Sequence, residues 1–167
     1  MPNDLPSVLL KFRQKAVGIG ADIKAMFSRI RLTRKDARYH RFLWKGEGDV
    51  EVCIYQVNHL TFGDGPSPFI AIKTLLKTAS DFGDRRERAV SAIKNHFYVD
   101  DYLDSFDTAE EAIEVGNQGR ATLKDGDFNI TKWASNSPTV RSAIGSENPP
   151  EFNQAGNDTE AKVLGMK

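Results

Sequence analysis

The segment Asn95–Phe106, NHFYVDDYLDSF, places two adjacent carboxylates, Asp100 and Asp101, inside an aromatic and apolar run, and Asp104 follows closely. Aspartate is unfavourable in strands, and a buried carboxylate is costly unless it is paired or binds a metal ion. The flanking residues predict two short strands that form a hairpin with Asp100 and Asp101 at its turn, where aspartate is well tolerated. Such a turn is either a solvated surface feature or a rigid place to present charge.

A further aspartate, Asp22, ends a second apolar run, Val17–Ile23, which predicts another strand. Three carboxylates that converge on one sheet repel one another unless a cation lies between them. Carboxylate oxygens are hard ligands that select Mg²⁺ or Mn²⁺, and two such ions about 4 Å apart form the clamp used in phosphoryl and nucleotidyl transfer. The sequence therefore predicts a two-metal site built from Asp22, Asp100 and Asp101.

The rest of the chain alternates between helical and strand-like patterns, which predicts an α+β fold with mostly antiparallel pairing. The turn signal GEGD separates two β-rich runs that we expect to form a hairpin. Residues Ile23 to Ile30 also fit a helical turn, so this stretch is ambiguous. The predicted helices are Leu5–Ala16, Phe69–Phe82, Arg85–Asn95, which either continues the preceding helix or is separate, and Asp107–Gly126, with Asp107 or Thr108 as its N-cap; the further predicted strands are Arg38–Lys45, Val50–Leu60, Phe128–Ser135 and Ala161–Lys167.

Composition excludes several classes of protein. The 167 residues carry 23 Lys and Arg against 23 Asp and Glu, so overall charge gives no sign of a polyanionic partner. Cys53 is the single cysteine, which excludes an intramolecular disulfide and a cysteine-rich zinc site and fits an intracellular location. No apolar run approaches the roughly 20 residues of a membrane span, and the N-terminus has no basic region typical of a signal peptide.

The segment Tyr98–Asp101, YVDD, resembles the Y-x-D-D box of reverse transcriptases. Other segments resemble the remaining boxes of that family in the correct order, and the resemblance runs from about Leu5 to Lys167. The sequences FNITKWASN and TEAKVLGMK are most similar to the corresponding boxes of polymerases of the BEL/Pao class of LTR retrotransposons. The other boxes are ADIKAMFSRIRL from Ala21, YQVNHLTFGDGPSPFIAIKTLL from Tyr55, GDFNITKWASN from Gly126 and KVLGMK from Lys162.

This resemblance implies a role for each matching residue at the metal site. Asp22 and Asp100 would bind both ions, Asp101 would support them, and the backbone carbonyl of Ile23 would complete one coordination shell. Lys132 would approach the triphosphate and protonate the pyrophosphate leaving group. The resemblance thus implies four catalytic residues, Asp22, Asp100, Asp101 and Lys132, and two Mg²⁺ or Mn²⁺ ions.

The resemblance also implies the contacts to nucleotide and primer. Phe27 would be the steric gate that excludes a 2′-hydroxyl, and we expect it to project beside Gly63 and not into the core. Phe62 would flank the same pocket, and Gly63 would let the backbone approach the nucleotide because it has no Cβ. Pro66 departs from the family, which usually has a small residue before Ser-Pro, and it stiffens this loop. The residues implied to contact the primer are Tyr98, Val99, Val163, Leu164 and Gly165.

The fold that follows is a polymerase palm with an antiparallel sheet backed by helices, plus part of the fingers, over residues 1–145. Residues 146–158 would be a polar loop or linker, and residues 159–167 the truncated start of the primer-grip strand. The partners would be an RNA or DNA template with its primer, deoxynucleoside triphosphates and the remainder of a polyprotein, in the cytoplasm or a virus-like particle, with no membrane. Because the upstream fingers and the thumb have no counterpart here, we expect this chain to be inactive by itself.

Two other interpretations stay open. The chain could be a non-catalytic remnant of a retroelement, with a polymerase-like fold and at most weak binding to nucleic acid. It could also be an unrelated metal-binding or nucleotide-binding α+β domain, which five boxes in order disfavour. A polymerase needs a basic groove along template and primer, and this chain offers local clusters such as RIRLTRKDARYHR, which equally suit a solvated face.

Overall fold

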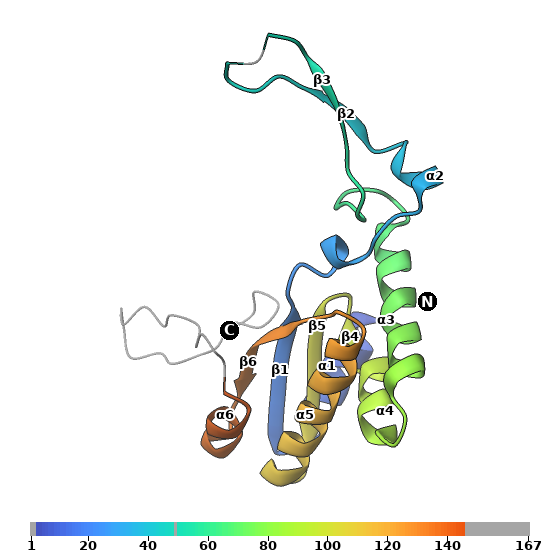
Figure 1. The fold of residues 1–167 in the computed structure, drawn as a ribbon. Helices are drawn as coiled ribbons and strands as arrows, with labels where there is room; N and C mark the ends of the chain where they lie inside the picture. The colour runs from blue at the N-terminus through green and yellow to red at the C-terminus, as the bar shows by residue number, and fades with distance from the viewer. Residues whose placement is uncertain (1–2, 49, 146–167) are drawn as a thin grey trace.

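A computed structural model describes residues 3–48 and 50–145, and within them the α+β prediction is confirmed. Four antiparallel strands form a sheet in the order β4-β5-β1-β6 (Figure 1). The hairpin predicted around Asp100 and Asp101 is present as β4 and β5. The strands are β1 (Val17–Ile23), β4 (Phe97–Tyr98), β5 (Asp101–Phe106) and β6 (Ile130–Ser135).

The two central strands carry the core of the protein. β1 pairs with β5 from Val17 opposite Phe106 to Asp22 opposite Asp101, and the side chains of Ile19, Leu103 and Phe106 are buried. Removing each of these side chains from water stabilises the folded protein by about 1.5–3 kcal/mol. The sheet thereby holds Asp22 and Asp101, two residues of the predicted metal site, in a fixed register.

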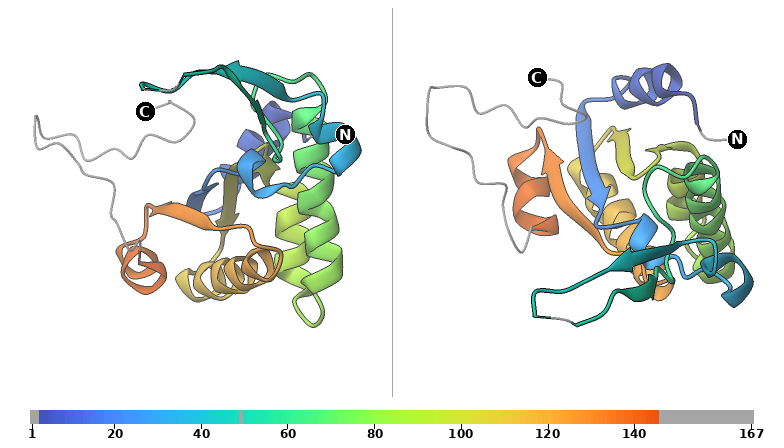
Figure 2. Two further views of the ribbon diagram at one scale, coloured as in Figure 1. Left: turned by 45° about the horizontal axis from the view of Figure 1, so that its top comes forward. Right: turned by 90° about the horizontal axis from the view of Figure 1, so that it is seen from above.

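Helices pack around this sheet (Figure 2). The longest, α5 (Ala109–Asp125), begins at Thr108, whose side chain accepts a hydrogen bond from the amide of Glu111, so Thr108 and not Asp107 is the N-cap. Gly116 of α5 sits where an added Cβ would lie 2.8 Å from Ile144, so glycine permits close packing. The other helices against the body are α1 (Leu5–Phe12), α3 (Ser67–Phe82), α4 (Glu87–Asn95) and α6 (Pro138–Ile144).

Two features differ from the sequence prediction or extend it. Of the two alternatives for Arg85–Asn95, the separate helix is the one present, as α4 (Glu87–Asn95), and α6 was not predicted. The sequence does contain a signal for the start of α6. Ser137 caps this helix by accepting a hydrogen bond from the amide of Val140, and Pro138 follows in the first turn. The expectations for residues 146–158 and 159–167, which include Val163, Leu164 and Gly165, lie outside the described residues.

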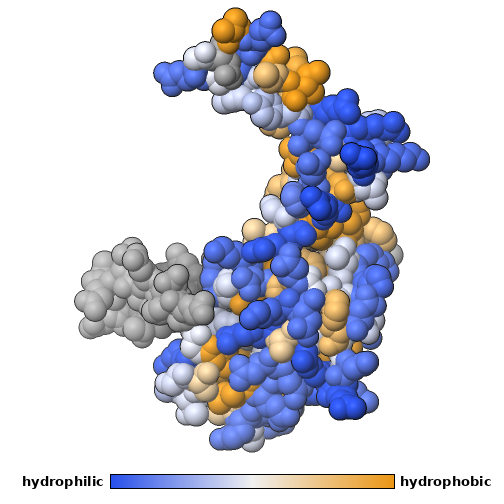
Figure 3. All heavy atoms as spheres, viewed as in Figure 1, coloured by the Kyte–Doolittle hydropathy of each residue, from blue (hydrophilic) through white to orange (hydrophobic). Residues whose placement is uncertain are grey.

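The predicted GEGD hairpin is confirmed as β2 (Arg41–Trp44) and β3 (Cys53–Gln56), which project from the body after the short helix α2 (Arg34–Ala37) (Figure 1). All of their residues are exposed, including Leu43 and Ile54, and hydrophobic residues are visible along this projection in Figure 3. A two-stranded ribbon with both faces in water adds little to the core.

No helix among the described residues is long and apolar enough to cross a membrane.

This contrast predicts a large difference between two leucine substitutions. Leu43 of β2 is 70% exposed, whereas Leu123 of α5 is fully buried. Leu43→Ala should change the free energy of unfolding by less than about 0.5 kcal/mol, and Leu123→Ala should lower it by about 2–5 kcal/mol. Urea denaturation followed by circular dichroism measures both. Equal losses would show that the hairpin is part of the cooperative core.

Candidate active site

The sheet register brings the predicted carboxylates together. Asp22 at the end of β1 lies directly opposite Asp101 at the start of β5, so the two side chains leave the same face of the sheet. Asp100 lies in the turn between β4 and β5, and its carbonyl accepts a hydrogen bond from the amide of Ile23 at 2.9 Å. Val99 in the same turn has φ of 55°, a left-handed conformation. The hairpin turn is therefore fastened to the end of β1.

Lys132 reaches the same place from the neighbouring strand β6. Its Nζ lies 3.1 Å from Oδ2 of Asp22. The pairing of β1 with β6 shifts register between Gly20 and Asp22, and Lys132 itself has φ of 54°. Irregularities of this kind re-aim side chains at the edge of a sheet. The structure thus gathers Asp22, Asp100, Asp101 and Lys132 at one end of the sheet.

Burial and mutual repulsion weaken the acidity of two of these carboxyls. Burial, followed by the charges of Asp100 and Asp22, raises the pKa of Asp101 from 3.8 to about 6, against the opposing effect of Lys132. Burial is also the main cause that raises the pKa of Asp100, and the charge of Asp22 adds to it. Ionising Asp100 and Asp101 therefore costs more free energy than it does in water, and a cation beside them reduces that cost.

The raised pKa predicts that Asp101 destabilises the fold above about pH 6. Its folded pKa exceeds the unfolded value, so its contribution to stability is greatest at low pH and is lost as pH rises from about 4 to 6. Asp101→Asn should therefore raise the free energy of unfolding at pH 7.5 by on the order of 1 kcal/mol, after allowance for solvent screening, and change it little at pH 4. Thermal or urea unfolding at both pH values measures this. A variant that is less stable at pH 7.5 would contradict the assignment.

The chemistry of these donors fits a divalent cation, but the site is not closed around one. Carboxylate oxygens that repel one another are the ligands that Mg²⁺ and Mn²⁺ prefer. Across residues 3–48 and 50–145, however, no three His, Cys, Asp or Glu side chains form a group ready to hold a metal ion. Oδ2 of Asp22 faces the ammonium of Lys132 instead. Binding of a metal ion would require these side chains to rearrange.

The predicted nucleotide contacts lie close together, with one correction. Phe27 is 8% exposed and belongs to the hydrophobic core, so the expectation that it avoids the core is wrong. Phe27 begins the short 3₁₀ turn Phe27–Arg29, which follows β1 after Lys24–Met26, and it is the buried residue of that turn. The ring nevertheless meets Phe62 edge-on, with centroids 4.8 Å apart, and Phe62 is 85% exposed. Phe62 therefore presents the accessible ring of this aromatic pair.

The loop that follows Phe62 depends on glycine for its conformation. Gly63 has φ of 94°, which strains any residue with a Cβ, although an added Cβ would meet nothing within 4 Å. Asp64 accepts a hydrogen bond from Thr61, and its carboxylate lies 3.3 Å from Nδ1 of His40. Pro66 then leads into α3, which has Pro68 in its first turn. These contacts and the conformation of Gly63 therefore fix the shape of the loop that connects the β2–β3 hairpin to the body.

The residues predicted to contact the primer are only partly described. Tyr98 is half-buried and pairs with Asp101 across the β4–β5 hairpin. Val99 is also half-buried and packs against the hydrophobic core. Both residues adjoin the carboxylates.

Asp104 has a structural role that sequence reasoning did not resolve. It is 1% exposed, and its carboxylate accepts hydrogen bonds from the hydroxyl of Tyr102 at 3.1 Å and the amide of Ser105 at 2.8 Å. Nδ1 of His96 lies 2.9 Å from Oδ1 of Asp104. Burial, and then the charge of Asp104, raises the pKa of Tyr102 well above 10. The third aspartate of the opening segment is therefore held by partners inside the fold, and His96 was not singled out from the sequence.

Comparison with known proteins gives no further assignment, since no protein-family model and no curated protein matches the chain.

Proposed function

We propose that this chain is the palm, with part of the fingers, of an RNA-directed DNA polymerase of the BEL/Pao retrotransposon type. The observation that supports this most is the placement of Asp22 opposite Asp101, with Asp100 in the adjoining turn and Lys132 in contact with Asp22. Carboxylates on two adjacent strand ends suit a reaction in which divalent cations and phosphates meet. The order of boxes along the sequence supports the same assignment.

Each side chain would have a separate task in nucleotidyl transfer. Mg²⁺ or Mn²⁺, when bound, would supply the charge that lowers the pKa of the primer hydroxyl and stabilises the pyrophosphate. Asp22 and Asp100, with Asp101 and the carbonyl of Ile23, would hold the two ions. Lys132 would approach the triphosphate and donate a proton to the leaving group.

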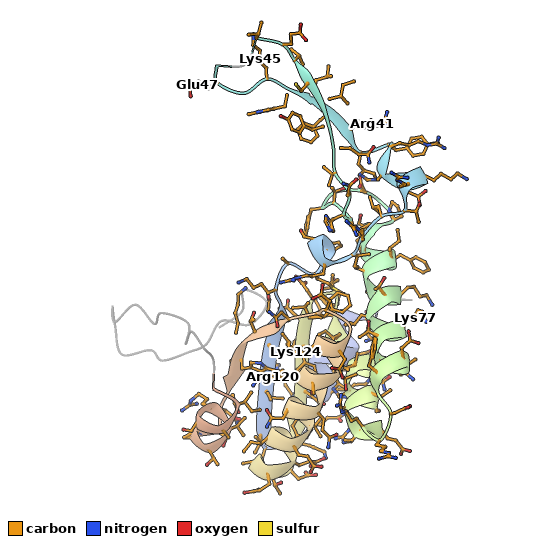
Figure 4. All side chains as sticks on the ribbon, viewed as in Figure 1. Arg41, Lys45, Glu47, Lys77, Arg120 and Lys124 are labelled. Atoms are coloured by element: carbon orange, nitrogen blue, oxygen red, sulfur yellow. The ribbon has the colours of Figure 1, made fainter. Side chains whose placement is uncertain are left out.

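The nucleotide and the strands would be held by neighbouring residues. Phe62 and the underlying Phe27 would contact the sugar, and Tyr98 and Val99 would lie beside the primer terminus. The partners would be a primed RNA or DNA template and deoxynucleoside triphosphates, with the remainder of a polyprotein in a cytoplasmic virus-like particle. Arg41 and Lys45 lie on the projecting hairpin (Figure 4), where basic side chains could face a nucleic-acid backbone.

A second candidate is a non-catalytic remnant with the same fold and at most weak binding to nucleic acid. The observation that favours it is the absence, in the part of the chain that the structure describes, of a ready-made metal group. The two candidates differ in whether nucleotide binding depends on a divalent ion and on the sugar.

Binding of nucleotides in the presence of Mn²⁺ separates these candidates. With a primed template, the chain should bind a deoxynucleoside triphosphate more tightly than the matching ribonucleotide, and only when Mn²⁺ is present. Phe62→Ala should weaken this preference about two- to tenfold without unfolding the protein, because the ring is exposed and contributes contact to the sugar pocket. Isothermal titration calorimetry measures it, with Phe69→Ala as an exposed aromatic control. Equal affinity for both sugars, unchanged by Phe62→Ala, would favour the remnant.

A further inference from the structure

The contact between Lys132 and Asp22 has a consequence for metal binding beyond the proposed catalytic roles. Asp22 is the more buried partner, with 24% of its side chain exposed, and Lys132 reaches it from β6 at 3.1 Å. The ammonium thus occupies one oxygen of a carboxylate proposed to hold the divalent ion. Since an ion pair and a metal bond to this oxygen both need its negative charge, the two interactions oppose each other.

Backbone geometry aims Lys132 at this position. Its φ of 54° is uncommon for a residue with a Cβ, and Lys132 lies within the irregular pairing of β1 with β6, between Thr131 opposite Asp22 and Ala134 opposite Gly20. Thr131, the residue before it, donates a side-chain hydrogen bond to the carbonyl of Asp22 at 3.4 Å. Two successive residues of β6 therefore contact Asp22.

We propose that Lys132 is an internal cation that competes with the divalent metal ion for Asp22, an inference that rests on the proposed function. In the metal-free protein, Lys132 neutralises Asp22 and limits repulsion within the carboxylate cluster. When the metal ion binds, the ammonium leaves Asp22 and becomes available to the phosphates. Lys132 thereby sets the affinity of the site for the ion, in addition to its proposed role in proton donation.

The test is Mn²⁺ binding to the full chain, measured by electron paramagnetic resonance of the free ion at pH 8 and low salt. Lys132→Met should bind Mn²⁺ about two- to fivefold more tightly than the wild type, and Lys132→Arg should stay near the wild type because it keeps the charge. The matched control is Lys77→Met, since Lys77 is similarly exposed and pairs with Asp81 at 2.8 Å on α3, away from β6 (Figure 4). This control should leave the affinity unchanged.

The double variant Asp22→Asn/Lys132→Met makes the outcomes separable. The proposal is supported if the gain from Lys132→Met disappears once Asp22 is replaced. It is overturned, with the metal site intact, if Mn²⁺ binding depends on Asp22 yet Lys132→Met binds no more tightly, or if Lys132→Arg shows the same gain as Lys132→Met. Binding that is absent from both the wild type and Lys132→Met, or that ignores Asp22→Asn, overturns this proposal and the proposed metal site together.

Discussion

Asp104→Ala should lower the free energy of unfolding by about 2–5 kcal/mol, since each buried donor left without its acceptor costs about 1–3 kcal/mol. The carboxylate is buried and receives hydrogen bonds from Tyr102 and the amide of Ser105. Its loss would leave the Tyr102 hydroxyl and the Ser105 amide without their acceptor inside the core. Urea denaturation at pH 7 measures the change.

The matched control for this variant is Asp81→Ala. Asp81 pairs with Lys77 on the exposed side of α3, and such pairs contribute about 0.3–0.5 kcal/mol. A loss at Asp104 no larger than the loss at Asp81 would show that the buried cluster does not hold β5. Because Asp101→Asn is expected to stabilise the protein at pH 7.5, two aspartates three residues apart should have opposite effects on stability near neutral pH.

Asp22→Asn should weaken Mn²⁺ binding by at least about tenfold, the scale of loss known for residues that support a metal site. Asparagine keeps the shape of the side chain but lacks the charge that attracts a hard cation. Asp22 also lies opposite Asp101, so the variant removes one of the two carboxylates that share a face of the sheet. Calorimetric titration with Mn²⁺, with and without a deoxynucleoside triphosphate, measures the effect.

Asp127→Asn is the matched control for this second variant. Asp127 is an exposed carboxylate in the turn before β6, 3.9 Å from Arg29, and its replacement makes the same change in net charge. Its Mn²⁺ affinity should equal that of the wild type. Equal losses in both variants would mean that Mn²⁺ responds to overall charge and not to a site at Asp22.

The sequence predicted the fold well where local patterns decide it. The aromatic and apolar residues around Asp100 and Asp101 predicted the β4–β5 hairpin, and the acidic first turn after Asp107 or Thr108 predicted the start of α5. The short helix α6 was missed because only seven residues carry its pattern, although Ser137 and Pro138 mark its start. Local signals therefore sufficed for the longer elements.

The sequence singled out the residues of the candidate site, but it did not show which of their side chains meet. Nothing in the spacing of Asp22 and Lys132 reveals that their side chains meet, because strand register and the irregular pairing of β1 with β6 decide it. Phe27 is buried at the 3₁₀ turn that follows β1, and His96, the C-cap of α4, lies beside Asp104 of β5. Contacts between distant segments are set by packing, which periodicity does not report.

The most direct test of the proposed site is the broadening of backbone amide signals by Mn²⁺ in nuclear magnetic resonance spectra of the full chain. In the presence of a deoxynucleoside triphosphate, substoichiometric Mn²⁺ should first broaden the signals of Ile23, Asp100, Asp101 and Lys132, which surround the carboxylate cluster. The same signals should stay sharp in Asp22→Asn. Broadening that begins at the acidic first turn of α5, Glu110 and Glu111, and leaves the end of β1 and the β4–β5 turn unaffected would contradict a metal site at this end of the sheet.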